Sequence, residues 1–204
     1  MKRYLFNQLS GPELERLCQR NTDTDQKITE RVETIITDVR KEGDAALRRF
    51  TRQFDGVETK KLYLDRAELE ELAATVGETE RKALETAFRN IQKFHEAQLT
   101  AEDRIETTPG VTCWREARAI EKVGFYIPGG TAVLPSTFLM LGVPAKIAGC
   151  GEVVVCTPPR PDGRVSPYVA WCAVRLDIGR VYLGGGAPAA AAMAYGTGTV
   201  PRGD

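Results

Sequence analysis

Residues 123–150 have the sequence VGFYIPGGTAVLPSTFLMLGVPAKIAGC. An apolar run at the start of this stretch ends at Pro128-Gly129-Gly130, and a segment of helical composition follows. Strand, glycine turn and helix in this order predict a βα unit with the geometry that binds nucleotides at its turn. Glycines let the backbone approach a ligand closely. A GxGxxG fingerprint is absent, so the residues alone also fit an ordinary βα turn.

The rest of the second half repeats the alternation of strand and helix. Apolar runs bounded by Gly and Pro predict strands, and longer segments between them predict helices, with Pro144 expected to kink or divide the first. This order is typical of a right-handed parallel sheet covered by helices. The expected strands are 111–118, 120–127, 153–157 and 180–183, and the expected helices are 137–148, 168–176 and 187–195.

The first half is richer in charge and has apolar residues at helical spacing. We expect helices around residues 28–39, from Asp44 as N-cap to a stop at Asp55-Gly56, and over 78–99, with a short strand at 62–64. One apolar stripe of the last helix is expected to pack: Leu84, Phe88, Ile91, Phe94 and Leu99. The fold class is therefore α/β, with a mainly helical region over 1–108 followed by an incomplete Rossmann-like nucleotide-binding domain over 109–204.

Composition narrows the class of partner. Lys plus Arg equals Asp plus Glu at 28 each, so no overall field favours nucleic acid or an anionic membrane, and a small polar metabolite is the expected ligand. The five cysteines show no CxxC or metal-ligand spacing, which indicates reduced side chains in a cytoplasmic protein. No stretch has the length and apolarity of a membrane span or an export signal.

Three predicted strand ends could form a site. Ligands of open parallel sheets bind at the carboxyl edge, where loop amides and helix N-termini meet anionic groups. The three ends are Pro128-Gly129-Gly130, Thr157-Pro158-Pro159 and Gly184-Gly185-Gly186. The residues themselves support nucleotide binding only weakly, because each of these turns also occurs without a ligand.

Longer stretches carry a resemblance. Residues 120–137 and 139–150, then 154–159, closely resemble the histidinol dehydrogenase family, as do 42–47, 54–57 and 185–197, in the same order along essentially the whole chain. The resemblance implies an NAD- and zinc-dependent enzyme that oxidises L-histidinol through histidinal to L-histidine, as the last steps of histidine biosynthesis. It also implies a homodimer whose sites borrow residues from the partner subunit.

The resemblance assigns a cofactor site but no catalytic one. It implies that Tyr126 contacts NAD and that Gly129, Gly130, Ser136 and Thr137 surround it. Pro188 stands where the family has a glutamine that contacts NAD, so weakened NAD binding is expected. In the family the zinc ligands and the catalytic glutamate-histidine pair correspond to positions after 204, so we assign no catalytic or metal residue. His95, the only histidine, is interpreted as structural or solvated.

Three interpretations stay open at this point. The first is a truncated histidinol dehydrogenase, inactive alone, with a missing C-terminal half supplied by another polypeptide or lost. The second is a non-catalytic nucleotide-binding or interaction module. The third is a related zinc- and NAD-dependent dehydrogenase of another small alcohol. For an incomplete sheet we expect an unpaired edge and therefore a homo-oligomer or aggregation.

Overall fold

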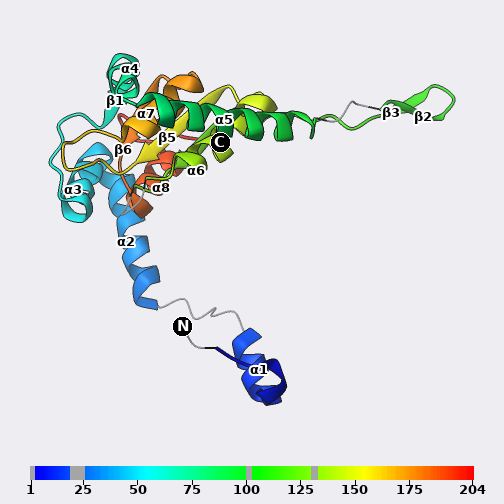
Figure 1. Ribbon diagram of the computed structural model, residues 1–204, viewed down its shortest axis with the longest axis horizontal. Coiled ribbons are helices and arrows are strands. Elements are labelled where there is room, and N and C mark those ends of the chain that lie inside the picture. The colour runs from blue at the N-terminus through cyan, green and yellow to red at the C-terminus, as the bar shows by residue number, and fades with distance from the viewer. Residues whose placement is uncertain (1–2, 19–25, 100–102, 130–132) are drawn as a thin grey trace. The chain divides into compact units, whose positions relative to one another are not determined.

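A computed structural model describes residues 3–18, 26–99, 103–129 and 133–204 (Figure 1). The chain divides into two compact units between Thr34 and Ile35. The first unit contains a 3-10 turn, η1 (Phe6–Gln8), the helix α1 (Gly11–Cys18) and the beginning of α2 (Gln26–Glu42), and none of its described residues is buried. All buried residues that the structure describes therefore belong to the second unit.

The second unit alternates helices and strands. Its sheet has the order β1-β6-β5-β4, in which β4, β5 and β6 are parallel and β1 is antiparallel to β6. The predicted α/β fold with a parallel sheet and covering helices is confirmed. Its elements are α3 (Asp44–Asp55), β1 (Tyr63–Asp65), α4 (Arg66–Ala74), α5 (Glu78–Glu96), β2 (Ile105–Thr108), β3 (Val111–Cys113), β4 (Lys122–Tyr126), α6 (Pro135–Ala148), β5 (Glu152–Thr157), α7 (Pro167–Arg175), β6 (Arg180–Leu183) and α8 (Gly186–Tyr195).

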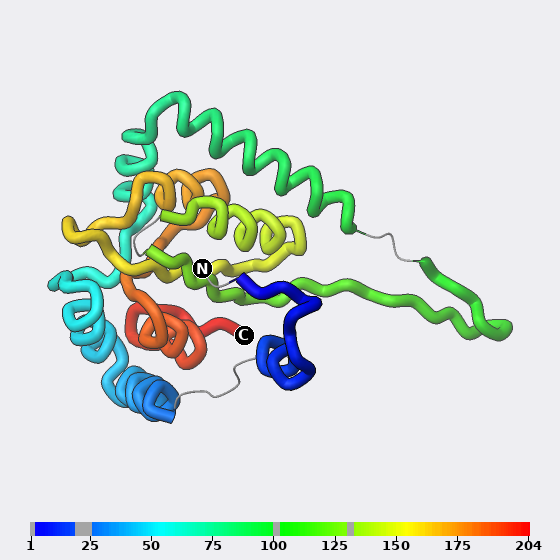
Figure 2. The backbone as a smooth tube through the Cα atoms, turned by 60° about the horizontal axis from the view of Figure 1, so that its bottom comes forward, coloured from blue at the N-terminus to red at the C-terminus, as the bar shows by residue number. Residues whose placement is uncertain are grey.

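Helices cover both faces of the sheet. Figure 2 shows α6 and α7, in yellow-green and orange, on one side of the strands and the red-orange α8 on the other. On the first face Val155 packs in one apolar cluster with residues of α4 to α7, and on the second Val154 packs with residues of α3 and α8. Because β5 is buried on both faces, its sequence is a continuous apolar run rather than an alternating one.

The chain changes direction around β4. Helices α6 and α7 connect β4, β5 and β6 across one face, whereas α8 lies on the other face and the following segment returns to the beginning of β4. There the Asp204 N–H donates to the carbonyl oxygen of Lys122 at 3.0 Å, and the Lys122 N–H donates to Asp204 Oδ2 at 2.9 Å. A further strand paired with the free edge of β4 would make the carboxyl end of β4 a topological switch point, the place where open α/β sheets bind their ligands.

Two helical predictions are corrected. Gly43, not Asp44, is the N-cap of α3, and Asp44 instead accepts hydrogen bonds from the hydroxyls of Thr197 and Thr199, 2.6 Å each. Of the two effects expected of Pro144, division of the helix is wrong, because α6 is continuous through it, and a kink stays a prediction. A proline removes one N–H that would donate to the carbonyl four residues earlier, and that residue, Met140, is 62% exposed, so water can replace the donor.

Two further predictions are wrong around residue 100. Only Val111–Cys113 of the expected strand 111–118 is extended, and it pairs with β2 in a separate antiparallel hairpin whose strand residues are all exposed. In α5, Leu84 and Phe88 are buried as expected, but Phe94 is 66% exposed. Leu99, after the helix, is 64% exposed. Helical spacing could not show that the core ends before the helix does. The domain division at 108/109 stays a prediction.

Candidate nucleotide-binding edge of the sheet

The carboxyl ends of β4, β5 and β6 are joined by hydrogen bonds that continue past the strands. The Ile127 N–H donates to the Cys156 carbonyl at 2.9 Å, and the Gly184 N–H donates to the Thr157 carbonyl at 2.9 Å. Between them the Thr157 hydroxyl, which is buried, donates to the Ile127 carbonyl at 2.8 Å. These bonds fix the three turns relative to one another, so that the edge is preorganised.

Two glycines of this edge face the same proline. A Cβ placed on Gly129 would lie 2.7 Å from Cγ of Pro158, and one on Gly185 would lie 3.1 Å from its Cβ. Side chains at either position would therefore push the β4 and β6 turns away from the β5 turn. The predicted site residue Gly129 is present at the edge, and its lack of a side chain is required by packing.

Tyr126 is the last residue of β4 and is 36% exposed. Side chains alternate along a strand, and Gly124 faces Met193 of α8, with 3.0 Å from its would-be Cβ to Met193 Sδ. Tyr126 therefore lies on the α8 face of the sheet, at its carboxyl edge. A half-exposed ring in this place is available for contact with a bound molecule.

Ser136 and Thr137 lie in the first turn of α6, on the opposite face of the sheet from Tyr126. The N-cap residue Leu134 makes no side-chain capping bond, so the first N–H groups of α6 are open to an anionic group. Among the residues described, no hydrogen bond joins Tyr126 to either hydroxyl. The structure thus brings these predicted residues to one edge without joining them, and Gly130 lies outside the described residues.

Pro188 lies in the first turn of α8 and is buried. A proline is well accommodated there, because the N–H it lacks would have no partner within the helix. Helix α8, which carries Pro188, begins just after the carboxyl end of β6 and lies on the same face of the sheet as Tyr126. Proline at this position offers no side-chain hydrogen-bonding group to a ligand.

Sequence reasoning missed Asp55, the last residue of α3. Its Oδ1 lies 3.6 Å from the would-be Cβ of Gly185, which places the carboxyl group at the same edge, and partial burial raises its pKa above the usual aspartate value. Within the described parts of the chain, no hydrogen bond or ion pair reaches this carboxylate. The sequence did contain a signal, because an acidic residue at a helix C-terminus opposes the helix dipole.

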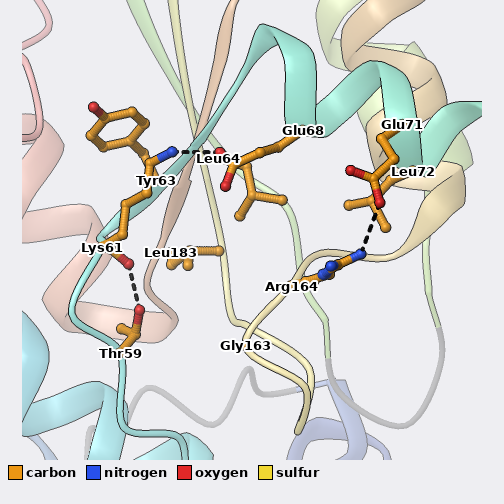
Figure 3. Close-up of a pocket in the computed structure, with 10 residues that line it drawn as sticks. All are labelled: Thr59, Lys61, Tyr63, Leu64, Glu68, Glu71, Leu72, Gly163, Arg164 and Leu183. Carbon is orange, nitrogen blue, oxygen red and sulfur yellow. Dashed lines mark hydrogen bonds and ion pairs between the residues drawn. The ribbon is translucent and has the colours of Figure 1, made fainter.

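A pocket of about 190 Å³ lies next to the end of β6 (Figure 3). It has charged walls, but the charges are paired: Lys61 Nζ lies 2.5 Å from Glu68 Oε2, and Arg164 Nη1 lies 3.5 Å from Glu71 Oε1. Cations that are already paired with carboxylates attract a phosphate weakly. The pocket is lined by Thr59, Lys61, Tyr63, Leu64, Glu68, Glu71, Leu72, Gly163, Arg164 and Leu183.

A second cavity, of about 540 Å³, opens between the turn from α4 to α5 and the beginning of α7. Its wall includes Val133 from the segment before α6, Arg160 from the turn after β5, and Tyr168 from α7. Arg160 forms no ion pair with any residue that the structure describes. Glu80 of α5 lines the cavity as well, so it carries one positive and one negative charge on the side of the sheet where Ser136 and Thr137 lie.

Zinc does not fit the residues described. Across 3–18, 26–99, 103–129 and 133–204, no three His, Cys, Asp or Glu side chains form a group that could hold a metal ion. His95 lies in the last turn of α5, with its Nδ1 3.1 Å from Gln98 Oε1 and its ring edge against Phe94. A metal site of the kind that three or four clustered ligands form would need residues from elsewhere.

None of the helices in the described ranges has the length and apolarity to cross a bilayer. All five cysteines are free thiols, and two of them, Cys156 and Cys172, are buried.

Comparison with known proteins identifies the family. A sequence model described as histidinol dehydrogenase matches residues 18–204. The chain is 46% identical over 205 residues to the histidinol dehydrogenase of Vibrio cholerae, covering 100% of this chain and 47% of the relative. It is 48% identical over 195 residues to the histidine biosynthesis trifunctional protein of Komagataella pastoris, covering 96% of this chain and 23% of that protein.

A solved structure agrees with the sequences. The crystal structure of histidinol dehydrogenase from Elizabethkingia anophelis superposes with a TM-score of 0.88 at 39% identity, covering 96% of this chain and 45% of that one. The chain spans less than half the length of each of these relatives. The match extends along nearly the whole chain in both sequence and structure, and the chain belongs to the histidinol dehydrogenase family.

Proposed function

We propose that this chain provides the NAD-binding part of a histidinol dehydrogenase, which oxidises L-histidinol through histidinal to L-histidine with NAD and zinc. The observation that supports this most directly is the position of Tyr126. In a chain of this family, a half-exposed tyrosine ends β4 at the carboxyl edge of the parallel sheet, beside a turn held against Pro158. A dinucleotide binds in such a place in open α/β sheets.

The proposed NAD site uses residues from both faces of the edge. Tyr126 contacts the dinucleotide, Gly129 lets the turn pack closely against Pro158, and the first turn of α6 with Ser136 and Thr137 receives an anionic group. Gly130 is assigned to the same site by the family resemblance alone. When bound, NAD supplies the hydride acceptor of the reaction. Pro188 gives no side-chain hydrogen bond, so we expect weaker NAD binding than in relatives with glutamine there.

We propose that the catalytic residues are not part of this chain. The zinc ligands and the glutamate-histidine pair that handles protons come from outside them, so we expect the 204-residue chain to be inactive alone. Support comes from ligand counting, since there is one histidine in the sequence. The active assembly would contain a complementary C-terminal half, and we propose that it is a homo-oligomer.

Exposed apolar surface supports an assembly of this kind. Met140 of α6 is 62% exposed and Leu141 is 39% exposed, next to each other on the helix that follows β4. Among the described strands, β4 pairs with β5 alone, so its other edge can accept a further strand. Free thiols fit the reducing conditions of the cytoplasm, where we place the enzyme.

Complementation tests the proposal. The purified chain is supplied with L-histidinol, NAD and zinc, and NADH is measured by absorbance with histidine identified as product. We expect no turnover from the chain alone. Turnover should appear when the carboxyl-terminal half of the Vibrio cholerae relative, the part that this chain does not cover, is added as a second polypeptide.

The outcomes separate the three interpretations. NAD binding without turnover in the mixture would instead favour a non-catalytic nucleotide-binding or interaction module. Turnover of another small alcohol in preference to L-histidinol would favour a related dehydrogenase. Turnover by the chain alone would contradict the assignment of catalysis to residues outside it.

A further inference from the structure

The carboxylate of Asp55 lies where the proposed dinucleotide passes. Gly185, at the end of β6, has Asp55 Oδ1 at 3.6 Å and Pro158 Cβ at 3.1 Å from its would-be Cβ, so the carboxylate and the β5 turn border the same glycine. Asp55 belongs to α3, which packs with α8 on the face where Tyr126 lies. The tyrosine and the carboxylate are thus on one face of one edge.

The spacing of the strands suits a dinucleotide. Strands β4 and β6 are separated by β5, so their ends are about 10 Å apart. A molecule that contacts Tyr126 at the end of β4 and extends along the edge passes Pro158 and then reaches Gly185. Because Gly129 and Gly185 have no side chains, both turns pack closely against Pro158, and neither residue places a side chain in the path of the ligand.

The carboxyl end of β5 lacks the acidic residue that usually binds the ribose of a dinucleotide. In nucleotide-binding halves of this architecture, an acidic residue some 20 residues after the glycine turn binds the ribose hydroxyls of the adenosine moiety. Here β5 ends at Thr157 and is followed by Pro158 and Pro159, and the Thr157 hydroxyl is buried and donates to the Ile127 carbonyl. No carboxylate at this strand end is available, and Asp55 is the carboxylate that α3 brings beside it.

We infer that Asp55 accepts hydrogen bonds from the adenosine ribose hydroxyls of NAD and disfavours NADP, whose 2′-phosphate its negative charge repels. The inference rests on the proposed function, which it deepens by assigning cofactor specificity to a residue outside the strand turns. A half-buried carboxylate with no cationic partner among the described residues has unused acceptor capacity. Two vicinal hydroxyls are donors that match its two oxygens.

Burial without a partner also indicates that Asp55 is not there for stability. Its pKa is raised because burial disfavours the charged form. A raised carboxyl pKa means that ionisation at neutral pH reduces the stability of the fold, so a neutral isostere should leave the fold intact or make it more stable. Residues that reduce stability in this way are concentrated at functional sites.

The test compares the affinity of the chain for NAD with its affinity for NADP. Dissociation constants of NAD and NADP are measured by isothermal titration calorimetry for the full chain and for Asp55→Asn. We expect the wild type to prefer NAD. In Asp55→Asn we expect NAD binding to weaken about tenfold or more, NADP binding to be unchanged or tighter, and the preference to fall accordingly.

A matched control has the same charge change at the opposite edge. Asp177 lies between α7 and β6, at the amino end of the strand, and its side chain is 89% exposed. Asp177→Asn should leave both dissociation constants unchanged. Thermal unfolding of each variant checks the fold, and Asp55→Ser, which also removes the charge, is measured in the same way if Asp55→Asn is unfolded.

The outcomes keep the two claims apart. NAD binding with the same NAD to NADP ratio in wild type and Asp55→Asn would overturn the role of Asp55 and leave the proposed function standing. An equal fall of the ratio in Asp177→Asn would show an effect of net charge and would also overturn the inference. A wild-type chain that binds neither dinucleotide would contradict both.

Discussion

The buried hydroxyl of Thr157, at the end of β5, donates a 2.8 Å hydrogen bond to the carbonyl oxygen of Ile127, just after β4. This bond connects the turn that carries Gly129 to the neighbouring strand end. Without it the Ile127 carbonyl would be left in the core with no donor. The geometry of the candidate site therefore depends on a side chain that is itself too buried to contact a ligand.

We expect Thr157→Val, which keeps the shape and removes the donor, to lower the free energy of unfolding by about 1–3 kcal/mol. Chemical denaturation measures this. Thr86→Val, at an exposed position of α5 where the hydroxyl donates to the Lys82 carbonyl, should change it by about 0.5 kcal/mol or less. Equal effects at the two positions would show that the bond at the edge has no special importance.

Gly129 should not tolerate a methyl group. In Gly129→Ala the new Cβ would lie 2.7 Å from Pro158 Cγ and 3.3 Å from its carbonyl oxygen, so the turn has to move. We expect a loss of about 1–3 kcal/mol of stability and weaker NAD binding, measured by denaturation and calorimetry. In Gly179→Ala the Cβ meets no atom within 4 Å, and that variant serves as the control. An unaffected Gly129→Ala would contradict the close packing of the turn.

Tyr126 should matter for binding and not for folding, because its ring is half exposed at the edge. We expect Tyr126→Ala to weaken NAD binding about tenfold, or about 1.4 kcal/mol, with an unchanged unfolding temperature. Tyr195→Ala removes a ring of similar exposure at the C-terminal end of α8, away from the carboxyl edge of the sheet, and should leave NAD binding unchanged. Identical NAD affinity in wild type and Tyr126→Ala would remove Tyr126 from the site.

Asp44 should stabilise the fold in a pH-dependent way. Partial burial raises the pKa of its carboxyl group, but hydrogen bonds from Thr197 and Thr199 outweigh burial and hold the pKa below the usual aspartate value. A lowered pKa contributes stability that is present above the unfolded-state pKa of about 3.9 and is lost as the pH falls through the folded-state pKa.

The corresponding variant is Asp44→Ala. At neutral pH we expect it to lower the free energy of unfolding by about 1.5–3 kcal/mol, because it removes hydrogen bonds to a charged acceptor. Between pH 7 and about 5 the difference from wild type should stay constant, and below about pH 4 it should shrink. Asp38→Ala, which removes a surface ion pair with Arg49, should cost about 1 kcal/mol or less. A pH-independent difference for Asp44→Ala would contradict the assignment.

Four of the five cysteines should divide into two groups by reactivity, and Cys150, of intermediate exposure, belongs to neither. Burial raises the pKa of both Cys156 and Cys172 to about 12, so neither forms a thiolate at neutral pH in the folded state. We expect a thiol reagent such as dithionitrobenzoate to modify exposed Cys18 and Cys113 rapidly and the two buried thiols only on unfolding. Fast reaction of all five thiols in the native protein would show that the sheet opens readily.

Much of the fold could be predicted from local pattern. The strands after residue 120 are apolar runs between Gly and Pro, and the helices between them have boundaries within two residues of those expected. The strand expected at 111–118 failed because residues 105–113 pair with each other in an exposed hairpin. Periodicity reports which residues could be buried, and only the presence of a partner surface decides whether they are.

Some residues of the candidate site could likewise be predicted from the sequence, and others could not. The residues of the glycine turn after β4 follow one another in the sequence, so Tyr126 and Gly129 could be assigned from resemblance. Asp55 could not, because it is 130 residues from Gly185 and reaches the edge only through the packing of α3 against α8. The same holds for Asp44, whose partners Thr197 and Thr199 are more than 150 residues away in the sequence.

The sequence by itself determined the family, the order of strands and helices, and the residues of the turn at the end of β4. Local composition and residue spacing are sufficient to identify these features. Tertiary structure alone decided which face of the sheet Tyr126 occupies, that Pro158 lies against both Gly129 and Gly185, and that a carboxylate from α3 lies beside them. The physical reason is that side-chain contacts across the sheet are set by how helices pack on its two faces, and this packing depends on residues far apart along the chain.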